Sequence, residues 1–376
     1  MKIAIDLTWL KPKKSGGVEF YIISLIQGFL NLKDDNSYVL FLAKDNFDYI
    51  YDKFKDKRIS FVLCNTYAND VKGHLIWQNI HQYKILKKHN ISFCFFPVYE
   101  MPIYKCKKIK CVTTIHDIQA YHYPQYFSKL ENIWFNMAWK RVLKNCNKVV
   151  TITKYTKDDI IENFKTYNNL TYIYNPIVID DKKILDFNKI SKKYNIKKNN
   201  YYYTVCSMHK HKNLITLIET IKTIKEKNIK DIPNTLVISG VGGPNKENLK
   251  NIIKEYNLEN NIIITDFVDD EIRNSLIVNS NCFLFPSLFE GFGMPPVEAM
   301  YLGAKVITTK CSSLYEVTKG KCDYVDDALS IEDWIDKIQN IQNKKRKKYH
   351  FEDYDLNVVS RKYLDLFYEV NGGKND

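Results

Sequence analysis

What the sequence lacks narrows the possibilities first. It has no stretch of about 18 apolar residues free of charge, so no helix is expected to span a bilayer. An early apolar run is interrupted by Asp6, which predicts no signal peptide and no export. The nine cysteines are odd in number, scattered and without a C-x-x-C pair, which predicts free thiols rather than disulfides or a zinc site. We therefore expect a cytoplasmic chain whose attachment to a membrane could only be peripheral.

Arginine is also scarce, although the net charge is +13. Only five of the 56 basic residues are arginines, and the lysines are spread along the whole chain. Base readout and bidentate phosphate binding favour arginine, so no nucleic-acid partner is expected. Two lysine clusters stand out, one formed by Lys105, Lys107, Lys108 and Lys110 and the other spanning 344–348. Each is predicted to be a solvated loop or helix end, with an anionic surface such as lipid headgroups as the alternative.

The length of 376 residues predicts two domains, and the shares of hydrophobic (45%) and charged (26%) residues are those of a globular protein. Apolar runs of strand length alternate with amphipathic stretches of helix length, which indicates parallel sheets covered by helices on both faces. Expected strands are 2–7, 38–42, 59–64, 93–96, 111–115, 148–152, 202–207, 235–239, 262–265, 282–285 and 305–308. Expected helices are 18–30, 156–164, 214–227, 246–256, 271–279, 295–302 and 356–369.

A polar segment interrupts this alternation and marks a domain boundary. We expect an N-terminal domain over 1–178, a linker over 179–200 and a C-terminal domain over 201–355. Residues 356–376 are expected to return to the first domain as a helix. The fold class is thus α/β, with two doubly wound, Rossmann-like domains facing across a cleft, and with ligands beyond the carboxyl ends of the strands.

The most informative segment is 285–306, FPSLFEGFGMPPVEAMYLGAKV. Gly291 and Gly293 follow an expected strand and precede a helix, so backbone N–H groups and the helix N-terminus can approach an anion such as phosphate. Glu290 and Glu298 could accept hydrogen bonds from hydroxyl groups of a sugar and a ribose. The alternative is that one of them caps the helix and the other lies on the surface.

The same segment resembles the E-x7-E signature of retaining nucleotide-sugar glycosyltransferases of family four, which have the GT-B fold. Other stretches resemble that family in the same order along the chain. They are Gly16-Gly17-Val18, Thr114-Ile115-His116-Asp117, Thr151-Ile152-Thr153-Lys154, Lys212-Asn213-Leu214, Phe267-Val268 and 312–317 (SSLYEV). The resemblance implies hexose transfer from a nucleotide-diphosphate sugar, with a leaning towards GDP-mannose, to a saccharide or lipid-linked acceptor in surface polysaccharide assembly.

The resemblance also implies that the N-terminal domain over 1–178 binds the acceptor and that the C-terminal domain over 201–355 binds the nucleotide-sugar donor. It further implies roles for individual residues. Glu298 would hold the donor ribose, and Glu290 would hold the sugar together with the backbone of Gly291, Phe292 and Gly293. Lys212, helped by His211, would bind the diphosphate, and Gly16 and Gly17 would let the first domain approach the phosphates. Gly240 and Phe267 would line the donor site. His116, Lys212 and Glu290 are the expected catalytic residues.

Some of these residues have ordinary alternatives. Lys212 could be an exposed loop lysine, and His116, which could donate to a sugar hydroxyl or hold the acceptor, could be a buried structural residue. Asp117 could belong to the donor site by orienting His116, or could cap the next turn.

Two departures from the family pattern bear on activity. His211 stands where an arginine is usual and Cys206 where a glycine is usual. A neutral histidine neutralises phosphate less well, so a catalytically inactive GT-B scaffold that binds anionic lipid or nucleic acid is the alternative function.

No cofactor or metal is expected. The D-x-D motif at 353–355 does not follow an expected strand, which argues against a divalent-ion site of the other glycosyltransferase architecture. The glycines around Gly240 lack the full G-x-G-x-x-G register, which argues against nicotinamide chemistry.

Overall fold

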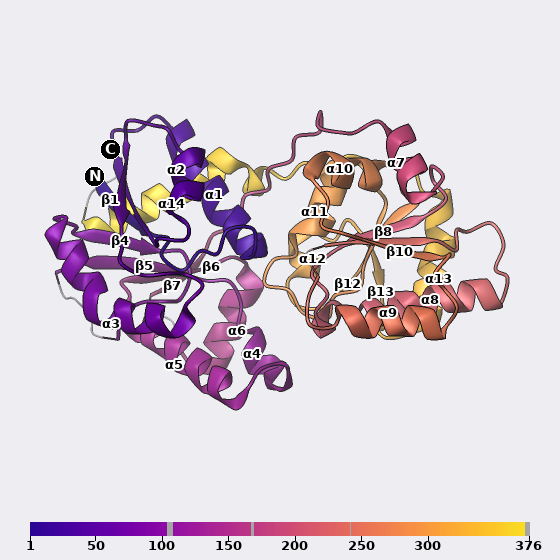
Figure 1. Ribbon diagram of the computed structural model, residues 1–376, viewed down its shortest axis with the longest axis horizontal. Helices are drawn as coiled ribbons and strands as arrows, with labels where there is room; N and C mark the ends of the chain where they lie inside the picture. The colour runs from indigo at the N-terminus through magenta and orange to yellow at the C-terminus, as the bar shows by residue number, and fades with distance from the viewer. Residues whose placement is uncertain (104–107, 167–168, 241, 373–376) are drawn as a thin grey trace. The chain divides into compact units, whose positions relative to one another are not determined.

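The computed structural model describes residues 1–103, 108–166, 169–240 and 242–372. The chain divides into two compact units, the first formed by Met1–Pro176 with Glu352–Asp376 and the second by Ile177–Phe351. Each unit has its own parallel sheet and its own hydrophobic core (Figure 1).

The first unit contains a seven-stranded sheet in the order β3-β2-β1-β4-β5-β6-β7, and all its strand pairs are parallel. Its strands are β1 Lys2–Asp6, β2 Ser37–Leu42, β3 Ile59–Leu63, β4 Phe93–Phe96, β5 Lys110–Ile115, β6 Lys148–Thr151 and β7 Leu170–Tyr172. Its helices are α1 Gly16–Asn31, α2 Phe47–Lys53, α3 Val71–Lys88, α4 Gln119–His122, α5 Lys129–Asn145, α6 Lys154–Phe164 and α14 Leu356–Asn371.

Both faces of this sheet are buried. On β1, Ile3 and Ile5 enter the core beneath α1 and α14, whereas Ala4 enters the core beneath α3, α5 and α6. Successive side chains of a strand point to opposite faces, so a strand between two helical layers is apolar throughout. This is why the strands are visible in the sequence as continuous apolar runs.

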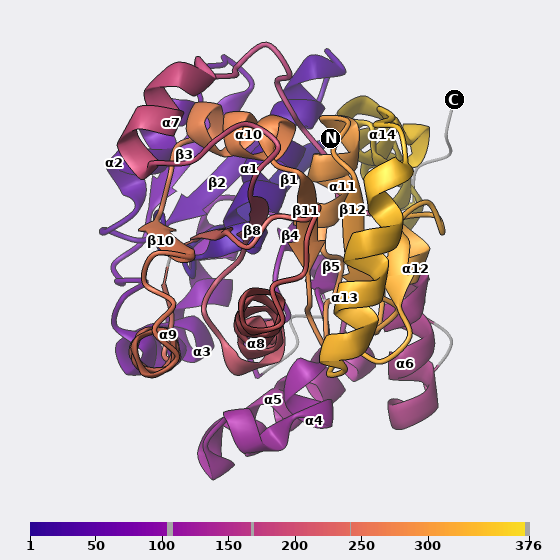
Figure 2. The same cartoon turned by 90° about the vertical axis from the view of Figure 1, so that its right-hand side faces the viewer.

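The second unit repeats the architecture with six parallel strands in the order β10-β9-β8-β11-β12-β13. Its strands are β8 Tyr202–Val205, β9 Leu236–Ser239, β10 Ile262–Asp266, β11 Cys282–Phe285, β12 Val306–Thr309 and β13 Asp323–Val325. Its helices are α7 Phe187–Tyr194, α8 Leu214–Glu226, α9 Lys246–Glu255, α10 Asp270–Asn279, α11 Met294–Tyr301, α12 Leu314–Val317 and α13 Ile331–Asn340. Within this unit α8, α9 and α13 cover one face and α10 and α11 the other (Figures 1 and 2). The predicted α/β class, with two doubly wound Rossmann-like sheets, is confirmed.

The segment expected as a linker, 179–200, is part of the second unit. Its helix α7 packs on α10, and Ile190 is buried in the second core. The side-chain amide of Asn274 donates to the carbonyls of Asp180 (3.3 Å) and Lys183 (3.1 Å). The segment is polar in composition, but one buried isoleucine and a few hydrogen bonds are enough to attach it to the core of the second unit.

The second unit ends at Phe351, whereas the sequence led us to expect residue 355. Tyr354 is fully buried in the first unit and packs edge-on against Tyr174, with 5.1 Å between ring centroids. Helix α14 follows and packs along α1.

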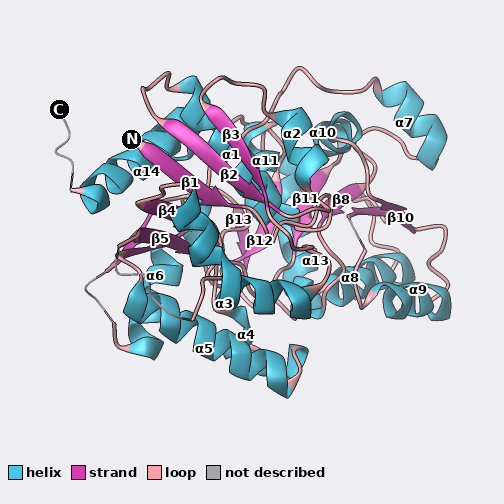
Figure 3. Cartoon of the chain, turned by 60° about the vertical axis from the view of Figure 1, so that its left-hand side comes forward, coloured by secondary structure: helices cyan, strands magenta, loops and turns pink. Residues whose placement is uncertain are grey.

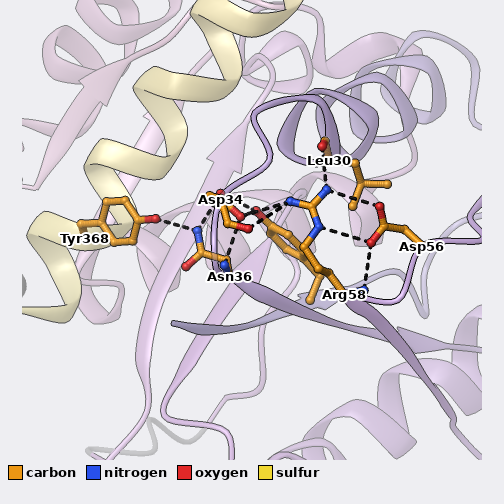
Figure 4. A network of polar contacts seen from close by, with 7 residues as sticks. Leu30, Asp34, Asn36, Asp56, Arg58 and Tyr368 are labelled. Atoms are coloured by element: carbon orange, nitrogen blue, oxygen red, sulfur yellow. Dashed lines mark hydrogen bonds and ion pairs between the residues drawn. The ribbon is translucent and has the colours of Figure 1, made fainter.

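A polar network in the first unit accounts for one of the five arginines (Figure 4). Arg58 donates to the carbonyl of Leu30 at the end of α1 (2.6 Å) and forms ion pairs with Asp34 (3.4 Å) and Asp56 (3.2 Å). Asn36 beside it donates to the Tyr368 hydroxyl of α14 at 2.6 Å. Arg58 therefore links the end of α1 and the following loop to the start of β3, and Asn36 links that loop to α14.

Candidate functional site

The strand order of the second unit reverses between β8 and β11. In a doubly wound sheet, ligands bind at such a switch point, beyond the carboxyl ends of the two strands, because the loops that follow them diverge there. The loop after β8 carries His211 and Lys212, and the loop after β11 carries Glu290 to Gly293. The two loops most implicated by the sequence therefore leave the sheet at its switch point.

Lys212 and Glu290 meet there. The Lys212 Nζ atom lies 2.5 Å from Glu290 Oε1, and the two side chains are only 15% and 11% exposed. The Lys212 ammonium also lies 5.8 Å from the ring centroid of Phe285. The structure thus contradicts the alternative that Lys212 is an exposed loop lysine.

Three hydrogen bonds fix the loop that carries Glu290. The Ser312 hydroxyl accepts from the backbone N–H of Glu290 at 2.7 Å. The single hydroxyl hydrogen of the fully buried Ser313 is shared between the carbonyls of Glu290 (2.9 Å) and Phe292 (3.1 Å). These contacts give the S-S-L-x-E-V stretch a physical role, because its two serines hold the glycine loop in place.

The backbone of one loop also binds the other. The N–H of Leu288 donates to the carbonyl of His211 at 2.8 Å. The residue beside Lys212 is thereby tied to the segment that leads to Glu290, so the lysine and the carboxylate are positioned together.

Gly293 cannot be replaced without strain. It caps α11 with φ +84°, and a Cβ built on it would lie 2.6 Å from Leu314 Cδ2. Gly240 is equally restricted, because its Cβ would lie 1.8 Å from the carbonyl oxygen of Cys206. Gly240 therefore lets the β9 loop pack directly on the backbone that leads to Lys212, whatever it contributes to ligand binding.

Glu298 lies on α11 and is 5% exposed. Burial raises the pKa of its carboxyl group, and the positive charge of Arg273 on α10 opposes that rise. Arg273 forms an ion pair with Asp270 at 3.1 Å, while its buried Nε has no hydrogen-bond partner. The structure therefore contradicts the alternative of a surface or capping glutamate and adds Arg273 as the cation facing it. The only signal for Arg273 in the sequence was the rarity of arginine.

His211 carries no charge at neutral pH. Burial lowers its pKa to about 3, assisted by the positive charge of Lys212 and by His209. The departure from the family's usual arginine thus leaves Lys212 as the charged member of this pair.

Phe267 follows β10 and its side chain is 67% exposed. Gly291 and Phe292 are buried in the loop after Glu290. A large aromatic ring exposed beyond the carboxyl end of a strand is available for stacking on a flat ligand.

In the first unit, His116 directly follows β5. Its Nε2 lies 2.8 Å from the carbonyl oxygen of Pro97, which can only accept, so Nε2 carries the proton and Nδ1 is the remaining acceptor. Burial lowers the pKa of His116 to about 4, so the ring is neutral at pH 7. Of the roles expected for His116, donation from Nε2 to a sugar hydroxyl conflicts with this contact, because that proton goes to Pro97. Holding the acceptor stays a prediction.

Asp117 makes the turn contact that was the alternative to a donor-site role, and the donor-site role itself stays a prediction. Its Oδ1 accepts from the backbone N–H of Gln119 at 2.9 Å, which stabilises the turn into α4. Gly16 and Gly17 are exposed in the first turn of α1. They follow β1, which borders the switch point β1/β4 of the first sheet.

A buried polar cluster at that switch point had no recognisable motif in the sequence. Asp6 accepts from the Thr8 hydroxyl (2.8 Å) and from the side-chain amide of Gln82 (2.7 Å), and Thr8 also contacts His74 Nε2 (2.9 Å). Nδ1 of His74 lies 3.9 Å from Glu100, whose pKa burial raises to about 7. His74 and Gln82 come from the inner face of α3, so this cluster holds α3 over the ends of β1 and β4.

The two lysine clusters have different outcomes. Lys105 and Lys107 lie outside the described residues, and Lys108 and Lys110 are exposed. The members of the second cluster fasten the end of the second unit, through Lys344 to Asp323 (2.6 Å), Lys348 to Asp181 (3.0 Å) and Arg346 to the carbonyls of Val278 and Ser280.

Within the described part of the chain, no three His, Cys, Asp or Glu side chains are grouped as metal ligands. No described helix combines the length and the apolar character needed to cross a membrane.

Comparison with known proteins agrees with this geometry. Residues 15–181 match the family model "Glycosyltransferase Family 4", and residues 186–355 match "Glycosyl transferases group 1". The O-antigen chain mannosyltransferase RfbU of Salmonella typhimurium is 27% identical over 266 residues, which cover 66% of this chain and 69% of that protein. The O-antigen biosynthesis glycosyltransferase WclY of Escherichia coli is 25% identical over 325 residues, or 86% of this chain and 84% of WclY.

Among solved structures, a glycosyltransferase from Rickettsia africae superposes with a TM-score of 0.72 at 19% identity, covering 99% of both chains. WaaG, described as a glycosyltransferase involved in lipopolysaccharide biosynthesis, superposes with a TM-score of 0.67 at 15% identity, covering 97% of this chain and 99% of WaaG. These likenesses show a shared fold. The chain belongs to the GT-B glycosyltransferases that combine a family 4 domain with a group 1 domain, and it is a glycosyltransferase.

Proposed function

We propose that this glycosyltransferase moves a hexose, with retention of anomeric configuration, from a nucleotide-diphosphate sugar to a saccharide or lipid-linked acceptor. The observation that carries the proposal is the pairing of Lys212 with Glu290 at the β8/β11 switch point, 2.5 Å apart. A cation and a carboxylate at this place suit the two halves of such a donor, its diphosphate and its sugar hydroxyls.

Departure of the nucleoside diphosphate places negative charge on phosphate oxygens, and that charge must be stabilised in the transition state. Lys212 supplies a fixed positive charge, and α8 begins two residues later at Leu214, so its N-terminus favours the same anion. With these groups present, we propose that no metal ion and no further cofactor take part.

The remaining donor contacts follow from position. Glu290 would accept hydrogen bonds from sugar hydroxyls, Glu298 from the ribose, and Phe267 would stack on the base. The positive charge of Arg273 would favour the ionised form of the buried Glu298 in that role. Gly16 and Gly17 would admit the phosphates from the side of the first domain.

In the transfer step, the bond between the anomeric carbon and the phosphate oxygen breaks as the acceptor oxygen bonds to the same face of that carbon. The proton of the acceptor hydroxyl moves to the departing phosphate oxygen, so no separate protein base is needed. Nδ1 of His116 would accept a hydrogen bond from the acceptor substrate. The first domain would hold the acceptor and the second the donor.

GDP-mannose or a similar donor, and an acceptor in surface polysaccharide assembly, are the substrates we propose. The support is that RfbU is named an O-antigen chain mannosyltransferase and WclY an O-antigen biosynthesis glycosyltransferase. Such a reaction would place the enzyme in the cytoplasm, at the inner face of the membrane. The inactive binding scaffold loses its support, because Lys212 and Glu290 are both present and paired despite the change at His211.

A donor screen tests the proposal. Melting temperature and donor consumption are measured with GDP-mannose, UDP-glucose, UDP-galactose and UDP-N-acetylglucosamine, because a ligand that binds the folded state raises the melting temperature. The matched variants are Lys212→Ala, which should abolish the shift and the turnover, and Lys225→Ala in the last turn of α8, which should preserve both. NMR of the product should show the donor's anomeric configuration. If no donor is bound or consumed, or if Lys212→Ala behaves like the native chain, the proposal fails.

A further inference from the structure

Helix α5 presents large apolar side chains to water. Leu130 is 80% exposed, and Ile133 and Met137 are each 57% exposed. Together with Lys140 and Lys144 they are spaced three or four residues apart and therefore lie on one face of the helix. The opposite face, with Trp139 and Val142, is buried in the first unit. The outward face of α5 is thus apolar in its first half and basic in its second.

Helix α3 continues this surface. Ile76 and Ile80, one turn apart on its outward side, are 61% and 52% exposed. Ile103, 50% exposed, is held against the helix because its backbone N–H donates to the side chain of Asn79 at 2.8 Å.

Both helices cover the same core of the first unit and lie on the same side of its sheet (Figures 1 and 3). The segment 99–103 contacts both helices. The ring of Tyr99 packs on Trp134 of α5 with 6.0 Å between centroids, and Arg141 of α5 donates to the carbonyl of Met101 at 3.1 Å. We define the docking face as the six exposed apolar residues of this region, Ile76, Ile80, Ile103, Leu130, Ile133 and Met137.

The charges on the two helices of the docking face are predominantly positive. Helix α3 contains no Asp or Glu and carries exposed Lys72, Lys84, Lys87 and Lys88. On α5 the exposed charges are Lys129, Lys140 and Lys144, with Glu131 as the one carboxylate. Glu131 is committed to the helix start, where it accepts from the backbone N–H of Ser128 at 2.8 Å.

We propose that the docking face binds the surface of a bilayer that contains anionic lipid. Apolar side chains ringed by lysines match such a surface in both respects, since the hydrocarbon chains take the apolar groups and the headgroups attract the ammonium groups. Both helices are firmly held from within, α3 by the buried cluster of Asp6, Thr8 and His74 and α5 by its buried aromatic residues. They therefore form a preorganised surface.

Charge argues against the other occupants. A second copy would bring the same lysines against this face, and nucleic acid offers no apolar surface for six aliphatic side chains. The proposal concerns membrane binding rather than sugar transfer, and its test uses no donor. Membrane binding can therefore fail while the proposed function holds, and the proposed function can fail while membrane binding holds.

The experiment measures co-sedimentation of the full chain with vesicles of phosphatidylcholine alone or with about 30% phosphatidylglycerol, in about 0.1 M and about 0.5 M salt. The native chain should bind only the anionic vesicles, and less at high salt. Changing Ile80, Ile133 and Met137 together to serine should lower the partition coefficient about tenfold or more, since exposed apolar groups no longer enter the bilayer. Lys140→Ala with Lys144→Ala should lower it about fivefold for each lysine removed.

Matched controls change exposed residues of the same kind elsewhere on the chain. The control for the apolar variant is Leu63→Ser, Ile184→Ser and Leu329→Ser, and the control for the lysine variant is Lys230→Ala with Lys254→Ala. Both controls should bind like the native chain, and melting temperatures show that every variant folds. The proposal is overturned if the apolar variant keeps native vesicle binding, or if both controls lose it equally. It is also overturned if sedimentation velocity shows a dimer that the apolar variant dissolves, or if an oligonucleotide binds and displaces the vesicles.

Discussion

Glu290→Gln should tighten the binding of a free nucleoside diphosphate while it weakens sugar transfer. In the structure the Lys212 ammonium is held by Glu290 at 2.5 Å. A diphosphate must take that ammonium from the carboxylate, and this competition lowers its affinity. The neutral amide of glutamine keeps the size of the side chain and removes the competing charge.

The expected magnitude follows from the burial of the pair. Exposed ion pairs contribute about 0.2–1 kcal/mol, and breaking a fully buried pair costs about 3–5 kcal/mol. With side chains 15% and 11% exposed, the Lys212–Glu290 pair lies between these limits. We take about 1.5 kcal/mol, which corresponds to about a tenfold change in affinity.

The assay is isothermal titration calorimetry with GDP and with UDP, run beside a transfer assay with the donor found in the screen. Glu290→Gln should lower the dissociation constant of the diphosphate about tenfold. It should also slow transfer about 10–100-fold, because the carboxylate no longer accepts from the sugar hydroxyls.

The matched control is Glu226→Gln at the far end of α8, where the glutamate is 63% exposed and 4.0 Å from Lys222. It makes the same change in charge and should leave both measurements unchanged. Weaker or equal diphosphate binding by Glu290→Gln would refute the reasoning, since Glu290 would then not compete for Lys212.

Three further predictions concern single positions. Gly293→Ala should lower the free energy of unfolding by about 1–3 kcal/mol in urea titration, because φ is +84° and the new Cβ meets Leu314 at 2.6 Å; an unchanged midpoint would contradict this. His211→Arg should lower the KM for the donor about 5–10-fold at pH 7, since the native histidine is neutral there with a pKa of about 3; an unchanged KM would show that this side chain does not face the phosphates. His116 binds its proton in the unfolded chain near pH 6.5 but in the folded chain only near pH 4, so stability should fall as pH drops from 6.5 to 4, by about 3 kcal/mol from this residue. His116→Gln should make that part of the pH profile flatter, and an equally steep profile would assign the loss to other groups.

The sequence alone predicted the order of the α/β units and the strands other than the short β7 and β13. The reason is local, because strands buried on both faces are apolar throughout, as Ile3, Ala4 and Ile5 show in β1. It did not reveal α3, whose inner face carries the polar His74, Gln78 and Gln82 while Ile76 and Ile80 point to water. Such an inverted pattern defeats any assignment based on hydrophobic periodicity.

The motif in the sequence identified Glu290, Glu298 and Lys212 as candidates from local signals, namely glycines after a strand and a helix start. It could not establish their geometry. Lys212 and Glu290 are 78 residues apart, and only the pairing of β8 with β11 brings their loops together. The facing of Arg273 and Glu298 likewise depends on α10 packing beside α11.

The sequence by itself determined the family, the class of fold and the residues with suitable chemistry, because all three depend on short stretches of chain. The tertiary structure decided which groups are paired, buried or neutral. It placed Nε2 of His116 against the carbonyl of Pro97 and the Asp117 carboxylate in a turn. It also left an apolar face with neighbouring lysines exposed on two helices, which no local pattern marks. These properties depend on the field and the packing around a side chain, and that environment is supplied by residues far away along the chain.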